Sequence, residues 1–322
     1  MNQTTRKTYL LNFPNAYQTG KRALLKLIRF CFESMGYILT RKRDYYGPTP
    51  SEFELSKTRS RWMKPSGLHG VYYDLDTMES SLAALCSEYM QDFLQLPPYK
   101  EMVRSGFGPG YPYVDAFVLY SMLRTIKPRH YLEVGSGLST AYARSALTCN
   151  AANGNKFSIT CIEPFPYNNL RSLADVQLIQ SPVQDVSLGE FAKLGADDIL
   201  FIDSSHILRI DGDVPFLFLE VLPTLCPGVI IHIHDIPFPF NIPYPAEFWT
   251  LLEHQRSHNW PMYWNEAMLV QAMLTGNSAF EILQSLPLLR FFRESRLRSL
   301  IPFSKSISEE PNTFSSLWLR KK

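Results

Sequence analysis

The second half of the chain alternates short apolar runs with longer amphipathic stretches. We expect buried strands over residues 131–134, 157–162, 176–180, 199–202 and 229–233. Between the last two of these runs, the spacing of apolar residues predicts a helix over 214–225. Alternation of this kind is typical of a mostly parallel sheet with helices on both faces. The pattern therefore predicts an α/β fold with a Rossmann-like, doubly wound sheet.

The rest of the chain is predicted to be largely helical. Apolar residues at helical spacing predict helices over residues 21–37, 77–94, 114–125, 248–254 and 267–274. We therefore expect three parts, namely a helical N-terminal extension or cap over residues 1–110, the sheet domain over 111–280 and a basic C-terminal tail over 281–322.

The first predicted helix is amphipathic and has basic flanks. Basic residues run from Lys21 to Arg43, while Leu24, Ile28 and Phe32 fall on one face. Such a helix either packs on its own protein or makes peripheral contact with an anionic membrane surface. Both interpretations stay open at this point.

Composition narrows the class of protein and its compartment. The chain has 322 residues, of which 45% are hydrophobic, so it can form a sizeable core. A net charge of +2 gives no argument for a nucleic-acid partner. The five cysteines form no C-x-x-C pair, and we find neither a signal peptide nor an apolar run long enough to span a bilayer. We therefore expect a reducing, cytoplasmic location, whereas the sequence does not indicate the oligomeric state.

A glycine turn follows the first predicted strand, in HYLEVGSGLSTAY (residues 130–142). Its glycines let the backbone approach a ligand, and the next helix begins there with free N–H groups. The candidate cofactor contacts in this stretch are Glu133, Gly135, Ser136, Gly137 and Ser139. The third glycine of a dinucleotide fingerprint is replaced by Thr140, and a carboxylate at Glu133 would repel a pyrophosphate. A cofactor with a cationic end fits better, which favours S-adenosylmethionine (SAM) over a turn formed for packing alone.

Further polar residues lie at the ends of the next two strands. Glu163 follows the second strand, where a carboxylate can accept both hydroxyls of a ribose. Gln184 and Asp185 follow the third strand and are candidates for the adenine edge. Because the carboxyl ends of parallel strands share one edge of the sheet, we expect these side chains near the glycine turn.

The fourth and fifth strands end in a cluster of candidate metal ligands. Asp203 and His206 follow the fourth strand, and His234 and Asp235 follow the fifth. We expect Asp203, His234 and Asp235 to bind Mg²⁺ or another divalent metal, and His206 to act as general base. A zinc hydrolase is disfavoured because the H-E-x-x-H motif is absent, and a His/His/Asp iron site would not explain the glycine turn. His232 is expected to be a core residue.

Taken together, these motifs resemble the class I SAM-dependent methyltransferases over about residues 113–274. LEVGSGLST is similar to their SAM-binding motif, CIEP to the ribose-binding acid and SPVQDV to the adenine-side segment. FIDSSH and HIHD resemble the metal-dependent O-methyltransferases, including catechol O-methyltransferase and the sugar O-methyltransferases of macrolide biosynthesis. In the sugar enzymes an aspartate binds Mg²⁺ and a histidine three residues later is the base, which correspond to Asp203 and His206. Histidine at position 234 replaces a carboxylate or amide of those families.

The resemblance implies methylation of a hydroxyl on a sugar, glycan or other small natural product. Two alternatives stay open. One is a methyltransferase that needs no metal, and the other is a non-catalytic accessory protein of glycan assembly that retains the fold.

Overall fold

The computed structural model describes residues 16–37, 39, 50–108, 110–242, 263–305 and 314–322. The predicted helix over 248–254 and the basic residues 41–43 lie outside these ranges. The chain divides into two compact units, residues 1–58 and 59–322, which we describe separately. In the first unit the described elements are α1 (Ala16–Ser34) and the start of α2 (Glu52–Trp62), which continues into the second.

The second unit is organised around one seven-stranded sheet with the order β3-β2-β1-β4-β5-β7-β6. The strands are β1 (His130–Val134), β2 (Ser158–Ile162), β3 (Val176–Ile179), β4 (Ile199–Ile202), β5 (Ile230–Ile233), β6 (Phe280–Ser285) and β7 (Leu317–Lys321). The first five run parallel, and β7 is antiparallel to both β5 and β6. The Rossmann-like prediction is confirmed, because the order reverses at β1, which pairs with both β2 and β4.

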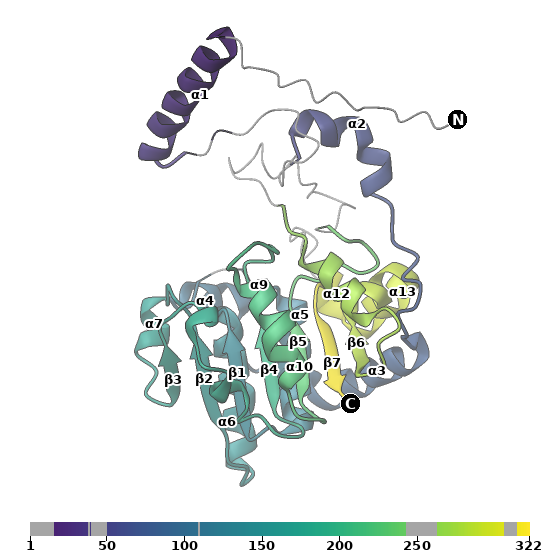
Figure 1. Ribbon diagram of the computed structural model, residues 1–322. Coiled ribbons are helices and arrows are strands. Elements are labelled where there is room, and N and C mark those ends of the chain that lie inside the picture. The colour runs from purple at the N-terminus through teal and green to yellow at the C-terminus, as the bar shows by residue number, and fades with distance from the viewer. Residues whose placement is uncertain (1–15, 38, 40–49, 109, 243–262, 306–313) are drawn as a thin grey trace, which may run out of the picture. The chain divides into compact units, whose positions relative to one another are not determined.

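Helices cover both faces of this sheet (Figure 1). The longer ones are α3 (Leu75–Leu94), α5 (Tyr113–Ile126), α6 (Leu138–Ala152), α12 (Glu266–Leu274) and α13 (Leu286–Leu300). Shorter helices are α4 (Tyr99–Arg104), α7 (Asn168–Arg171), η1 (Val183–Asp185), α8 (Leu188–Phe191), α9 (Asp213–Phe216), η2 (Leu217–Val221), α10 (Leu222–Thr224) and η3 (Pro302–Lys305). In Figure 1, α9 and α10 lie in front of the sheet, and α5 lies behind it. The inner strands β4 and β5 are buried along their whole length, which explains their apolar sequences.

The C-terminal segment is not the basic tail that the sequence suggested. Residues 281–322 supply nearly all of β6, all of β7 and the helix α13. Leu317, Trp318 and Leu319 are fully buried, because β7 lies between β5 and β6. The apolar run Leu-Trp-Leu is short and stands beside basic residues, so its burial was not evident from the sequence.

The expected boundary at residue 110 also differs from the structure, since the division falls at 58/59. α3 lies within the sheet-containing unit, and Phe93 at its end contacts Phe117 of α5 with ring centroids 5.3 Å apart. Arg293 of α13 forms ion pairs with Asp76 and Glu79 of α3. Only the part before residue 59 is therefore separate. None of the helices that the structure describes is long and apolar enough to cross a membrane.

Candidate active site

The turn between β1 and α6 brings the backbone of two strands into close contact. Gly135 has a φ of +80°, and a Cβ built on it would lie 1.9 Å from the carbonyl oxygen of Asp203. Only glycine satisfies both conditions. The turn thereby lies against the backbone that follows β4, and residues Gly135 to Ser139 line a cavity of about 270 Å³.

Glu133 lies behind this turn rather than in the cavity. Its side chain is fully buried, and Ser139 Oγ donates a hydrogen bond of 2.5 Å to Glu133 Oε1. Burial raises the pKa of Glu133 to about 8, although the hydrogen bonds from Ser139 and Thr140 act in the opposite direction. The carboxyl therefore supports the turn through Ser139, and the structure does not bring it to the cofactor cavity as the sequence suggested.

Glu163 lies at the mouth of the site, immediately after β2. Its two oxygens accept hydrogen bonds from the backbone N–H groups of Ser136 at 3.1 Å and Phe165 at 2.8 Å. Each carboxylate oxygen has a second lone pair, so the side chain can still accept ligand hydroxyls. Glu163 lines the turn cavity and a neighbouring cavity of about 510 Å³, and so connects the two.

Of the two residues expected near the cofactor after the third strand, only one lines a described cavity. Gln184 lines the larger cavity, together with Pro182 and Val183. Asp185 is exposed and is not among the residues that line this cavity. Phe165 and Arg209 also line this cavity, and neither was a candidate site residue in the sequence analysis.

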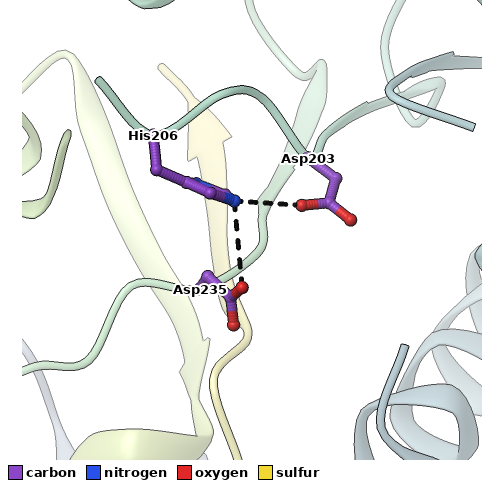
Figure 2. Close-up of side chains that lie close together, drawn as sticks. All are labelled: Asp203, His206 and Asp235. Carbon is purple, nitrogen blue, oxygen red and sulfur yellow. Dashed lines mark ion pairs between the residues drawn. The ribbon is translucent and has the colours of Figure 1, made fainter. Parts of the chain in front are cut away.

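Asp203, His206 and Asp235 converge at the carboxyl ends of β4 and β5 (Figure 2). His206 Nε2 lies 3.3 Å from Asp203 Oδ1 and 3.8 Å from Asp235 Oδ2. His206 and Asp235 both have positive φ values, +60° and +55°. This left-handed conformation is costly for residues other than glycine and is often found at functional sites.

Neighbouring charged groups shift the pKa values of Asp203 and His206 from their ordinary values. Burial would raise the pKa of Asp203, but the adjacent histidines 234 and 206 outweigh it and hold that pKa well below its ordinary value. Burial would lower the pKa of His206, but hydrogen bonds with Asp203 and Glu266 raise it well above its ordinary value.

His234 lies deeper than the other three residues. Its Nδ1 is 3.5 Å from Asp203 Oδ1 and 3.7 Å from Asp235 Oδ2, longer than ordinary hydrogen bonds. Its Nε2 is 3.1 Å from Ser315 Oγ. Burial would lower the pKa of His234, but Asp235 and Asp203 raise it to about 9. The tight group of ligand atoms thus contains His206 where the sequence favoured His234.

His232, expected in the core, is fully buried. It packs between Phe201 and Trp318, with ring centroids at 4.4 and 4.5 Å. Neither of its ring nitrogens has a hydrogen-bond partner among the described residues. Burial holds its pKa well below the ordinary value, so the ring is neutral.

Glu266 is a site residue that the sequence analysis missed. It begins α12, is buried, and contacts His206 Nδ1 at 2.7 Å through Oε2. An acid at the start of an apolar helix is usually a capping residue, and Glu266 is sixty positions from His206 in the sequence. Its position in the sequence did not indicate that it would be buried against His206.

The donor set fits a divalent cation. One ligand atom each from Asp203, His206 and Asp235 lies within 4.8 Å of the others, as needed for shared coordination. Two carboxylates and an imidazole are compatible with Mg²⁺, Mn²⁺ or a similar ion, with the remaining positions open to water or substrate.

This topology and site agree with a family match. Residues 132–236 match a family model described as a methyltransferase domain, and they span the strands β1, β2, β3, β4 and β5. The chain carries a class I methyltransferase domain. By this domain it is a SAM-dependent methyltransferase, and the glycine turn and Glu163 both lie within residues 132–236.

Solved structures similar to this methyltransferase are distant in sequence. A Podospora anserina methyltransferase bound to S-adenosylhomocysteine is 15% identical, with 86% of this chain and 99% of that chain covered and a TM-score of 0.33. The O-methyltransferase TomG from Streptomyces achromogenes, in complex with SAM, is 17% identical, with 66% and 82% covered and a TM-score of 0.36. A Geobacter sulfurreducens methyltransferase is 14% identical, with 73% and 96% covered and a TM-score of 0.36. The sequence matches no curated protein.

Proposed function

We propose that this methyltransferase methylates a hydroxyl group of a sugar, glycan or small natural product in a reaction that needs a divalent cation. The observation that carries the proposal is the convergence of Asp203, His206 and Asp235 beside the cofactor cavities. Asp203 belongs to both places, since it lines the two cavities and contributes to the cluster. An acceptor oxygen at the cluster would therefore lie next to the methyl donor.

The chain's residues have distinct roles in this proposal. Glu163 binds the ribose hydroxyls of SAM, and the turn from Gly135 to Ser139 faces its amino acid end. His206 removes the proton of the acceptor hydroxyl at Nε2, the ring nitrogen that faces Asp203 and Asp235. The acceptor oxygen then bonds to the SAM methyl carbon as the carbon–sulfur bond breaks, and S-adenosylhomocysteine leaves.

The cation supplies one further effect. When bound, a divalent cation is a Lewis acid that stabilises negative charge on an oxygen at this position. Asp203 and Asp235 are suited to hold it because they bring two carboxylates to one side of His206.

The test is methyl transfer from radiolabelled SAM to a panel of sugars, glycosides and phenols, with Mg²⁺ or with EDTA. We expect label in an acceptor with Mg²⁺, and its loss with EDTA and in Asp235→Asn. Transfer to oxygen that survives EDTA and Asp235→Asn would establish a metal-independent enzyme and refute the role of the cation. Transfer to nitrogen would refute the acceptor class. A protein that neither binds SAM nor transfers label would instead indicate a non-catalytic accessory protein.

We also propose that α1 attaches the protein to an anionic membrane surface. On a helical projection of α1, Leu24 and Ile28 share one face, while Lys26 and Arg29 lie on another. The large apolar side chains of the segment are exposed, namely Leu24, Leu25, Leu27, Ile28, Phe30, Phe32 and Met35. An apolar face beside a cationic one is suited to lie in the headgroup region of anionic lipids.

Vesicle flotation tests this attachment. We expect binding to vesicles that contain phosphatidylserine, weaker binding to pure phosphatidylcholine, and loss of binding in Ile28→Glu. Ile28→Leu changes the same side chain without adding a charge and is the matched control. Equal binding to both lipids, no binding, or equal loss in both variants would refute the proposal.

A further inference from the structure

We propose that Glu266 is a positioning residue that fixes the ring orientation and the tautomer of His206. The proposal rests on the proposed function, in which His206 Nε2 receives a proton. It concerns a residue from a distant part of the chain, at the start of α12, that does not line the cofactor cavities.

The contact between the two side chains is short and shielded from water. Glu266 Oε2 lies 2.7 Å from His206 Nδ1, and the two residues are 1% and 5% exposed. The ring of Trp264 packs against the imidazole with centroids 4.3 Å apart. Both ring nitrogens face carboxylates, which can only accept, but the contact of Nδ1 with Glu266 at 2.7 Å is shorter than that of Nε2 with Asp203 at 3.3 Å, so the single proton of a neutral imidazole is held on Nδ1. Nε2 is then left as the acceptor nitrogen.

Ser204 fixes the carboxylate itself. Its Oγ donates to Glu266 Oε1 at 3.0 Å and accepts a hydrogen bond from the backbone N–H of His206 at 3.1 Å. Both oxygens of Glu266 are therefore engaged by the loop that carries His206. The side chain has little freedom to turn away and to release Nδ1.

The backbone of α12 holds the same loop from the other side. The N–H groups of Asn265 and Glu266 donate to the carbonyl oxygen of His206, at 3.0 and 3.2 Å. Asn265 Oδ1 accepts a hydrogen bond of 2.6 Å from the backbone N–H of Leu208. These contacts support the left-handed conformation of His206, whose φ is +60°. The start of α12 thus sets both the backbone and the ring of the proposed base.

The two ring nitrogens of His206 therefore have different partners. Nδ1 is bound to Glu266, and Nε2 faces the carboxylates Asp203 and Asp235. The same geometry orients the nitrogen whether it takes a proton or binds a cation, because a buried carboxylate on one nitrogen raises the basicity of the other.

The test is a long-range ¹H–¹⁵N NMR spectrum of the full-length protein with ¹⁵N-labelled histidine, recorded over a series of increasing pH. Resonances of His206 are assigned by their loss in His206→Ala. In the wild type we expect Nδ1 to keep its proton while Nε2 loses one. In Glu266→Gln, whose amide can accept from or donate to Nδ1, we expect this selectivity to be lost. Glu220→Gln, the same change at an exposed position, should leave the spectrum unchanged.

The wild-type spectrum decides the question even if Glu266→Gln does not fold. A wild-type His206 that keeps its proton on Nε2 would overturn the proposal, and so would unchanged selectivity in a folded Glu266→Gln. SAM binding is measured on the same wild-type sample by calorimetry. Absence of SAM binding contradicts the proposed function, whereas SAM binding with the other tautomer contradicts only the role of Glu266.

Discussion

The buried carboxyl of Glu133 makes the stability of this protein depend on pH. Burial raises its pKa in the folded protein to about 8, compared with an ordinary value of 4.5. Between these two pH values the folded chain keeps a proton that the unfolded chain releases. The free energy of unfolding therefore decreases as the pH rises through this window, and the contribution is fully present below about pH 4.5.

The size of the effect follows from the two pKa values. At about 1.36 kcal/mol for each pKa unit, the change from 4.5 to about 8 amounts to roughly 5 kcal/mol. Relaxation and water entry on ionisation reduce this value, so we take it as an upper bound. Glu133→Gln preserves the size of the side chain and carries no ionisable group. Its stability relative to the wild type should thus increase by several kcal/mol between pH 5 and pH 8.

Urea unfolding at pH 5, 6.5 and 8 measures this difference for wild type and Glu133→Gln. Other groups titrate in both proteins, so the informative quantity is the difference between them at each pH. Glu220→Gln, at an exposed position, should remain within about 0.5 kcal/mol of the wild type throughout. A difference between wild type and Glu133→Gln that does not change with pH would refute a buried carboxyl with a raised pKa.

Two further predictions concern the cation and the turn. Mn²⁺ binding, followed by electron paramagnetic resonance, should weaken by about tenfold or more in Asp235→Asn. It should also strengthen with increasing pH, because a protonated His206, whose pKa is raised, places a positive charge beside the cation held by Asp203 and Asp235; pH-independent binding would contradict this. Gly135→Ala should destabilise the protein by about 1–3 kcal/mol in thermal unfolding, since its Cβ meets the Asp203 carbonyl. Gly154→Ala has a similar φ of +89° with nothing within 4 Å of its Cβ, and an equal loss there would assign the effect to φ alone.

The sequence was sufficient to predict the five parallel strands of the sheet and the strand ends at which the cluster of Asp203, His206 and Asp235 lies. The strand patterns and the rule that parallel strands end at one edge led to Asp203, His206 and Asp235, which the structure brings together. The rule concerns strand ends, so it gave no information about Glu266, which reaches the same place from a helix.

Finer details were beyond sequence reasoning. Which side chain at a strand end faces a cavity depends on local backbone geometry, so the sequence did not reveal that Glu133 and Asp185 lie outside the lining of these two cavities. His234 was expected to meet Asp203 across the neighbouring strand; its Nδ1 lies 3.5 Å from Asp203 Oδ1, while its Nε2 contacts Ser315 from the C-terminal segment. That segment joins the sheet through long-range pairing of β7, which its short apolar run did not indicate.

The most direct test of the account is calorimetric measurement of SAM binding to wild type and Glu163→Ala, each with Mg²⁺ and with EDTA. We predict binding to the wild type at micromolar concentrations. Loss of the Glu163 carboxylate removes hydrogen bonds to a charged group and should weaken binding by about tenfold or more. Absence of binding to the wild type in every condition would contradict the assignment of the glycine turn and Glu163 as a SAM site.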